Sequence, residues 1–178
     1  NGTGKSTVGK LLAGLMKPRI GAIVWPGRRR LSWLARRRTQ PHAGFVLQDP
    51  TVQLFCDTVA DEVSFGLRNY DRFSDARLAA VLEVADLLSL RDRPIRALSC
   101  GQQQRTALAA SLALMPDLLI VDEPTLGQDW GHLSQLMDHL VSLNQGGMTI
   151  LIVTHDYKVI CRYVQRILVL QGGHVIAD

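Results

Sequence analysis

LSCGQQQR at residues 98–105 and LLIVDEPTLGQD at residues 118–129 decide the fold of this chain. The second stretch opens with a short apolar run, Leu118 to Val121, which is typical of a strand buried on both faces of a parallel sheet. Two carboxylates, Asp122 and Glu123, follow the run directly. Open α/β sheets bind their ligands at the carboxyl ends of the strands. Successive residues of an extended chain point to opposite faces, so we expect the two acids to have different partners.

The first seven residues indicate what these acids would face. Asn1-Gly2-Thr3-Gly4-Lys5-Ser6-Thr7 is similar to a phosphate-binding loop, G-x-x-x-x-G-K-[ST], that lacks its first glycine. Glycines let the backbone approach phosphates, and the amides at the following helix start point at the anion. Lys5 would contact the β- and γ-phosphates, and the Ser6 hydroxyl would bind Mg²⁺. An ordinary glycine turn is disfavoured because an apolar periodic helix follows, so we predict that this whole loop binds ATP.

Further motifs follow along the chain. Gln48 ends the run Phe-Val-Leu-Gln, Asp129 follows the acidic pair, and His155 ends the run Ile-Val-Thr-His. Together with the phosphate loop, the acidic pair and residues 98–105, they resemble the ATP-binding subunit of ABC (ATP-binding cassette) proteins over nearly the whole chain. The resemblance implies an α/β fold with a P-loop NTPase parallel sheet core and an inserted α-helical subdomain. Residues 1–178 would form one ABC ATPase domain, with the helical subdomain at about residues 50–115.

The resemblance also implies a role for each motif residue. Glu123 would be the general base that polarises the attacking water, assisted by His155 and Gln48. Mg²⁺ would be bound by Ser6, Gln48 and Asp122. The residues expected to act on the nucleotide of a second subunit lie in the signature, Ser99, Gly101 and Gln103, and Asp129 would link the two sites.

Composition excludes several other classes of protein. The 178 residues suffice for one domain with a sizeable core, and 47% hydrophobic with 20% charged residues is ordinary for an α/β protein. No apolar run reaches the roughly 18 residues that would span a bilayer. The scattered cysteines, Cys56, Cys100 and Cys161, lack the spacing of a disulfide framework or a zinc site, and they fit a reducing cytosol.

The net charge of +4 comes mainly from arginine, with clusters at residues 28–30 and 36–38. Such clusters could bind nucleic acid or lipid headgroups. A solvated surface loop between strands is the favoured interpretation, so we expect no nucleic-acid partner.

Hydrophobic periodicity and turn residues predict the elements between the motifs. Ser74 is the expected N-cap of a helix. Leu54 and Phe55 would either contact a partner helix or fold into the helical subdomain, and both alternatives stay open. Histidines outside the motifs are expected at the surface: His42, His132, His139 and His174. The expected strands are 20–25, 43–48 and 149–153, the expected helices are 74–88 and 133–143, and a hairpin is expected at 167–177.

Residues 49–66 resemble the corresponding segment of energy-coupling factor (ECF) transporter ATPases, which serve vitamin and transition-metal uptake. The resemblance implies an ATPase homo- or heterodimer on the cytoplasmic face of the cell membrane. This dimer would bind an integral membrane transport subunit and couple hydrolysis of MgATP to import. The resemblance further implies an N-terminally truncated fragment, in which the strand upstream of the phosphate loop is missing.

Two residues depart from the family pattern. Cys100 replaces a glycine, which would cost about 1 kcal/mol or more if that position needs a positive φ and would add little bulk otherwise. Gln128 replaces the residue more common before Asp129. Cys100 is the one hint of an alternative, a hydrolysis-impaired nucleotide-binding partner in a heterodimer. Another alternative is a soluble, non-transport ABC ATPase. Its DNA-repair type is disfavoured because about ninety residues without sustained heptads separate loop and signature.

Overall fold

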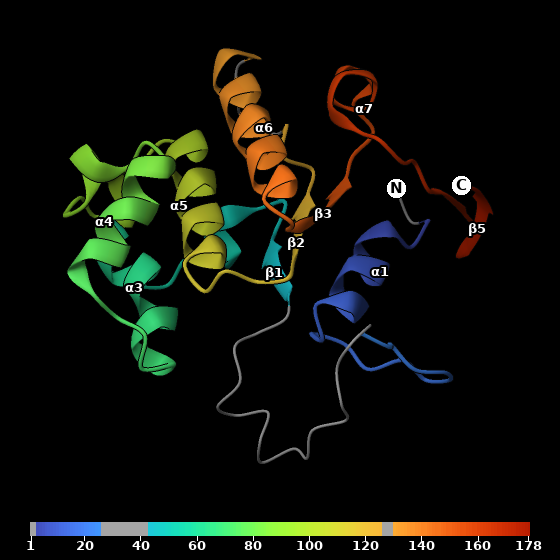
Figure 1. The fold of residues 1–178 in the computed structure, drawn as a ribbon, viewed down its shortest axis with the longest axis horizontal. Helices are drawn as coiled ribbons and strands as arrows, with labels where there is room; N and C mark the ends of the chain where they lie inside the picture. Colours follow the sequence, from blue (N-terminus) through green and yellow to red (C-terminus); the bar gives the residue numbers. More distant parts are fainter. Residues whose placement is uncertain (1–2, 26–42, 126–129) are drawn as a thin grey trace.

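The computed structural model describes residues 3–25, 43–125 and 130–178. Its centre is a sheet of three parallel strands, β1 (Ala43–Val46), β2 (Leu118–Asp122) and β3 (Thr149–Val153), in the order β1-β2-β3. Every residue of β2 is buried, as expected for an apolar run between two neighbouring strands. The parallel sheet and the helices on its two faces confirm the predicted α/β fold (Figure 1).

Three helices of the described ranges cover this sheet. α1 (Lys5–Leu12) packs on one face, and α5 (Cys100–Leu112) and α6 (Trp130–Gln145) pack on the other (Figure 1). α6 includes the predicted helix 133–143 and is longer at both ends. Since α5 and β2 are separated by a short connection, they run in opposite directions, and the start of α5 lies level with the carboxyl end of β2.

The residues of β2 alternate between the two faces. Leu119 and Val121 belong to the hydrophobic core under α5 and α6. Leu118 and Ile120 belong to a separate cluster that includes residues of α1. Because the alternation has a period of two, it places Asp122 on the α1 face of the sheet.

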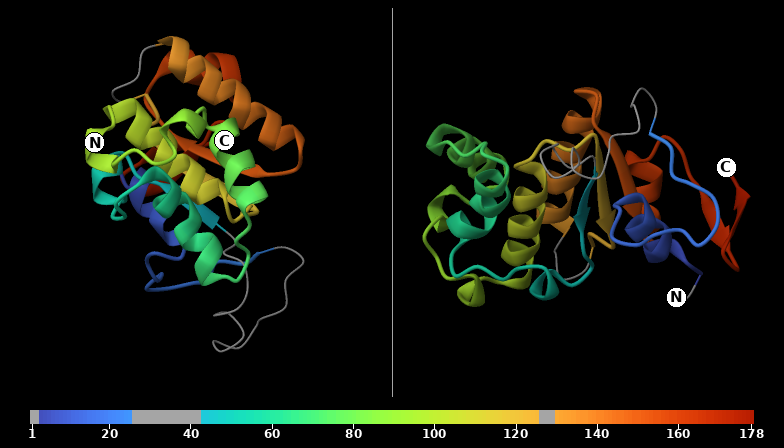
Figure 2. Two further views of the ribbon diagram at one scale, coloured as in Figure 1. Left: turned by 90° about the vertical axis from the view of Figure 1, so that its left-hand side faces the viewer. Right: turned by 90° about the horizontal axis from the view of Figure 1, so that it is seen from below.

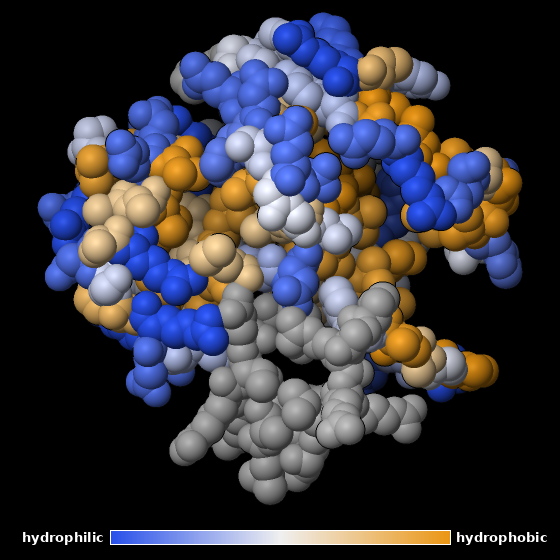
Figure 3. Space-filling view, in the orientation of Figure 1, coloured by the Kyte–Doolittle hydropathy of each residue, from blue (hydrophilic) through white to orange (hydrophobic). Residues whose placement is uncertain are grey.

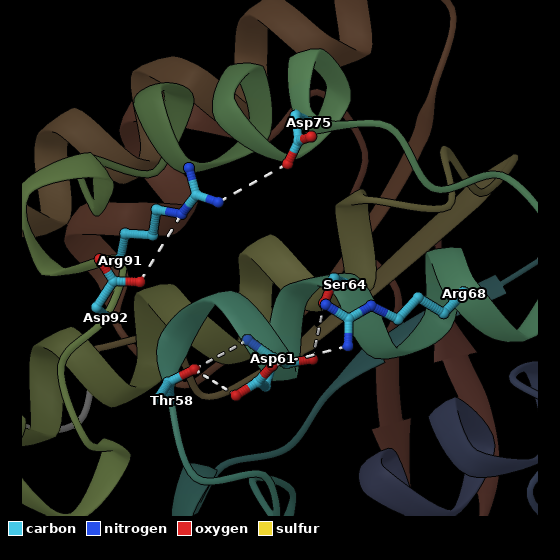
Figure 4. Close-up of polar contacts among 7 residues, drawn as sticks. All are labelled: Thr58, Asp61, Ser64, Arg68, Asp75, Arg91 and Asp92. Carbon is cyan, nitrogen blue, oxygen red and sulfur yellow. Dashed lines mark hydrogen bonds and ion pairs between the residues drawn. The ribbon is translucent and has the colours of Figure 1, made fainter.

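Two further helices, α3 (Val59–Asn69) and α4 (Asp75–Val84), pack with α5 around a second core beside the sheet (Figures 1 and 2). Thr58 caps α3: its hydroxyl accepts from the Asp61 amide at 3.2 Å and donates to the Asp61 carboxylate at 2.6 Å. Arg68, two turns along α3, reaches the same carboxylate at 3.8 Å (Figure 4). The start of α3 is thus held by local polar contacts, and its apolar face is held by the second core.

Helix α4 begins as predicted and ends earlier. The Ser74 hydroxyl accepts from the amide three residues on, at 3.2 Å, and therefore caps the helix. The predicted helix 74–88 stops at Val84 because Asp86 adopts a left-handed conformation, with φ of 53°. The Leu87 amide then donates back to the Leu82 carbonyl at 2.8 Å, which satisfies a carbonyl at the helix end.

The C-terminal part contains α7 (Tyr157–Tyr163) and an antiparallel hairpin of β4 (Val169–Gln171) and β5 (His174–Ala177), which confirms the predicted hairpin. Short 3₁₀ helices connect the larger elements: η1 (Pro50–Val52), η2 (Leu88–Leu90) and η3 (Ile95–Ala97).

A cavity of about 580 Å³ lies between α1, α6, β3, α7 and residues 164–170. Its walls are mostly apolar, and hydrophobic surface gathers on the same side of the molecule, over the C-terminal strands (right-hand side of Figure 3). Within the described ranges β2 is the one strand that pairs with β3, and the whole length of β3 lines this cavity.

Two sequence predictions of strands need correction. The predicted strand at residues 20–25 is wrong: no strand forms there, and Ile20 and Val24 are exposed. An extended run becomes a strand only when a neighbour pairs with it, and none of the described residues does so. The strand predicted at 43–48 ends at Val46, two residues early.

The histidine prediction is also wrong in one case. His139 on α6 is partly buried, and burial lowers its pKa below the usual value. Its Nε2 is buried without a hydrogen-bond partner among the described residues. His174 is exposed as predicted, whereas His42 and the side chain of His132 lie outside the described part of the chain.

Leu54 and Phe55, expected either to contact a partner helix or to fold into the helical subdomain, differ in their exposure. Leu54 packs against the core under α5 and α6, whereas Phe55 is 66% exposed and stacks edge-to-face on Phe65 of α3. In the described ranges, no helix combines the length and the hydropathy that crossing a bilayer requires.

Gly9 of α1 determines how closely this helix approaches the sheet. A Cβ atom there would lie 2.9 Å from Phe45 Cε2 and 3.3 Å from Ile120 Cγ2, both on buried side chains. We predict that Gly9→Ala lowers the free energy of unfolding by about 1–2 kcal/mol, because overpacking outweighs the higher helix propensity of alanine. Urea denaturation of the single variants and of Gly9→Ala/Phe45→Leu measures this. The double variant should lose less unfolding free energy than the two single variants lose in sum, because the smaller leucine side chain at position 45 leaves room for the new methyl group. Strictly additive losses would contradict the close contact.

Candidate functional site

The two acids at the end of β2 are buried. Asp122 is 4% exposed and Glu123 is 9% exposed. Asp122 Oδ1 and Glu123 Oε2 have no hydrogen-bond partner within the described ranges. Buried carboxylate oxygens without partners are costly, so this pair indicates that a cation or a polar ligand belongs beside it.

Glu123 leaves the strand through a strained backbone conformation. Its φ is 51°, a left-handed value that is uncommon for a residue with a long side chain. Its amide still donates to the Val153 carbonyl at 2.7 Å, which extends the pairing of β2 with β3 by one step. Observed strain of this kind is concentrated at functional sites.

His155 follows β3 and lies against Glu123. The distance between His155 Nδ1 and Glu123 Oε1 is 2.8 Å, while 81% of the His155 side chain is exposed. The structure therefore joins two residues that are 32 positions apart in sequence, one buried and one facing solvent. One edge of the imidazole is held by Glu123 and the other remains available for a ligand.

The start of α1 has the features of an anion site. Gly4 is the N-cap, with φ of 92°, and no side chain caps the helix. The first amides of a helix have no partner within the helix, and its N-terminal end carries partial positive charge. Lys5 Nζ adds a full charge and donates to Thr3 Oγ1 at 2.9 Å. Ser6 and the exposed Thr7 occupy the same first turn.

The acids and His155 lie at one edge of the sheet, and Lys5 of α1 lines a cavity together with Thr154 at that edge. Because parallel strands end at the same edge, the residues after β2 and β3 lie together there, and Asp122 shares the α1 face. Hydroxyl and carboxylate oxygens are the ligands that Mg²⁺ takes, with substrate phosphates completing its shell. The unpartnered Asp122 oxygen fits such an ion. The described residues contain no cluster of three or more His, Cys, Asp or Glu that could hold a metal without a substrate.

The signature residues lie elsewhere. Ser99 caps α5: its hydroxyl accepts from the Gln102 amide at 3.3 Å, and the Gln102 side chain accepts from the Ser99 amide at 3.0 Å. Gln103, one residue further, donates its side-chain amide to the Ile95 carbonyl at 3.2 Å. With Gly101, these residues start the helix on the face opposite α1. The structure does not bring them to this chain's own phosphate loop.

Cys100 causes no backbone strain. It is the first residue of α5 and is exposed. In the described ranges the non-glycine residues with positive φ are Asp71, Asp86, Met115 and Glu123, so Cys100 is not among them. The positive-φ argument for an impairing Cys100 is therefore removed, because the backbone conformation at this position does not demand glycine.

Three of the predicted site residues, Asn1, Gly2 and Asp129, lie outside the described residues, as do Gln128 and the arginine clusters at 28–30 and 36–38. Gln48 is exposed, two residues beyond the end of β1. Sequence reasoning assigned no role to the side chain of Gln53, which bonds the backbone at Phe45 and Leu47, or to that of Glu62, which bonds the backbone at residues 55 and 56. Both residues lie in the segment 49–66 that resembles ECF ATPases, and this resemblance was the signal available for them.

The sequence matches the ABC transporter family over residues 1–126. The chain belongs to this family. Proteins named as ABC transporter ATP-binding proteins are 38% identical to the whole chain in Methanosarcina mazei and 39% identical in Methanosarcina acetivorans. The chain spans 30% and 29% of their respective lengths, so it corresponds to less than a third of these relatives.

Solved structures of ABC proteins share the fold. One is cbiO1 of Clostridium perfringens, part of the ABC transporter complex cbiONQ, which is 35% identical in sequence and has a TM-score of 0.84. The match covers 99% of this chain and 72% of the cbiO1 chain. Another is the ATP-binding cassette MJ0796, solved as a dimer bound to ADP and Pi, which is 30% identical and has a TM-score of 0.85. The match covers 99% of this chain and 80% of the MJ0796 chain. The prediction of a P-loop NTPase core of the ABC type is thereby confirmed.

Position 100 allows a direct test of the strain argument. We predict that Cys100→Gly lowers the free energy of unfolding by about 0.5–1 kcal/mol, because glycine loses more backbone entropy at a helical position with negative φ. Cys100→Ala, the size control, should change it little. Urea denaturation measures both variants. A more stable glycine variant would show that Cys100 is strained after all.

Proposed function

We propose that this chain is the ATP-binding and ATP-hydrolysing part of an ABC importer of the ECF type. The observation that carries the proposal is the Glu123–His155 pair, with one Glu123 oxygen held at 2.8 Å and the other buried without a described partner. A carboxylate oriented in this way can accept a proton from a water molecule that attacks a phosphate. Lys5 at the start of α1 lines the same cavity as Thr154, the residue before His155, which supports a phosphate substrate.

Each residue of the site has a role in this proposal. The amides at the start of α1 and Lys5 would bind the β- and γ-phosphates of ATP. Mg²⁺, when bound, would supply positive charge to the phosphate oxygens, and Ser6, Asp122 and Gln48 would hold it. Glu123 would orient water in line with the γ-phosphate, while His155 would hold the Glu123 carboxylate and contact the γ-phosphate.

The signature supports a dimer. Ser99, Gly101 and Gln103 lie on the sheet face opposite α1, so they cannot serve this chain's own nucleotide without a large rearrangement. We propose that they complete the site of a second ATPase subunit, and that Asp129 links the two sites. The dimeric structure of MJ0796 bound to ADP and Pi supports this assembly.

The importer assignment rests on similarity to cbiO1, part of the cbiONQ complex, and on the ECF-like segment at residues 49–66. We propose that the helices around the second core form a helical subdomain within about residues 50–115. Exposed Phe55 and Phe65 on this subdomain would face an integral membrane subunit at the cytoplasmic face of the membrane. A metal ion or a vitamin would be the imported substrate.

Glu123→Gln tests the proposed chemistry. We expect ATP turnover by the full-length protein with its membrane partner to fall by about 100-fold or more, because glutamine cannot accept a proton. ATP binding should persist, since the lysine and the helix start are unchanged. Glu83→Gln, the same change on the exposed face of α4, should leave turnover unaltered. An unaltered rate for Glu123→Gln would rule out the assignment of the base.

Purification from membranes tests the assembly. We expect the full-length protein to co-purify with an integral membrane subunit after mild detergent extraction. Recovery of the protein from the soluble fraction alone would contradict the importer assignment and favour a soluble ABC ATPase.

A further inference from the structure

The side chain of Gln53 makes two hydrogen bonds to the backbone at the end of β1. Its Nε2 donates to the Phe45 carbonyl at 3.1 Å, and its Oε1 accepts from the Leu47 amide at 3.0 Å. Ser111 of α5 also donates to the Phe45 carbonyl, at 3.3 Å. A residue eight positions from Phe45 in the sequence thus contacts the same strand twice.

These two contacts imitate a neighbouring strand. In a parallel sheet, one residue of a strand bonds the carbonyl of residue i and the amide of residue i+2 on the partner. Phe45 and Leu47 have this spacing, and within the described sheet β1 pairs with β2 on its other edge. The primary amide of Gln53 therefore occupies the outer edge of β1 in place of a strand. It satisfies a donor and an acceptor there.

The contacts close the loop that carries Gln48. Residues 47 and 53 are joined through the Gln53 side chain, so the chain between them forms a closed turn. Asp49 stiffens this turn, since its carboxylate accepts from the Thr51 amide at 2.9 Å and from the Thr51 hydroxyl at 2.6 Å. Gln48 therefore has its backbone fixed on both sides, although its own side chain is exposed.

A second side chain holds the segment that follows. Glu62 of α3 is 5% exposed, and its Oε2 accepts from the amides of Phe55 and Cys56 at 2.9 and 2.8 Å. The backbone therefore has anchors on both sides of Gln53: the end of β1 before it and α3 after it. A displacement of α3 would be transmitted to the loop of Gln48 through these contacts.

We infer that Gln53 is a positioning residue of the nucleotide site, whose side-chain amide fixes the loop of Gln48 to the outer edge of β1. The inference rests on the proposed role of Gln48 beside Mg²⁺ and water. The two contacts require an amide at position 53, because only an amide of this length offers a donor for the Phe45 carbonyl together with an acceptor for the Leu47 amide. A glutamate would place an oxygen against the Phe45 carbonyl, and a methionine would make neither bond.

Kinetics of the full-length protein with its membrane partner test the inference. We expect Gln53→Glu and Gln53→Met to lower kcat about 10- to 100-fold while the KM for ATP stays within about twofold, because displacement of a positioned group affects the reaction more than binding. Gln135→Glu on the exposed face of α6 is the matched control and should change neither constant. Wild-type kcat in both Gln53 variants, or an equal change in the control, would overturn the inference.

Hydrogen exchange at the Leu47 amide tests the contact without relying on catalysis. In the wild-type protein this amide should exchange at least about tenfold more slowly than an unprotected amide, and both variants should remove this protection while the amides of β2 stay protected. A Leu47 amide that exchanges freely in the wild type would refute the contact even if the variants failed to fold. Loss of Leu47 protection with normal kcat would refute the positioning role. Absence of ATP turnover in the wild type would instead refute the proposed function.

Discussion

Two carboxylates that end a fully buried strand are the constraint on which the rest of this structure depends. The strand β2 is buried because it lies between two parallel neighbours and under helices on both faces. Its apolar run ends in Asp122 and Glu123, each with one oxygen that lacks a partner among the described residues. In the proposed function, a charged ligand beside these acids offsets this cost.

The side chains of β2 alternate between the two faces of the sheet, and this alternation separates two groups of motif residues. One set of side chains faces α1, and the other faces α5 and α6. The phosphate loop and Asp122 therefore belong to one face, while the signature at the start of α5 belongs to the other. In the proposed function a single chain presents two incomplete half-sites, and the separation of the two faces is the physical reason for proposing a dimer.

The sequence was most informative where local chemistry determines structure. The apolar run at 118–121 predicted a buried strand, and Ser74 predicted a helix start. The sequence failed where partners decide the outcome: residues 20–25 are apolar, yet nothing in the described chain pairs with them. Helix α4 ended early through the left-handed Asp86, a conformation that propensity does not reveal. The family resemblance implied that His155 assists Glu123, which their contact fits, whereas the contacts of Gln53 and Glu62 depend on tertiary packing and were not anticipated.

The central claim is that the acids at the end of β2 are held ready for a cationic ligand and substrate. Thermal unfolding of the full-length protein and of its Asp122→Asn variant, each with and without MgATP, tests this most directly. Asp138→Asn on the exposed face of α6 is the control. Removing the buried charge should leave the nucleotide-free protein as stable or more stable, by about 1–3 kcal/mol, and should reduce the stabilisation by MgATP. A variant that is less stable without nucleotide and equally stabilised by MgATP would contradict the claim.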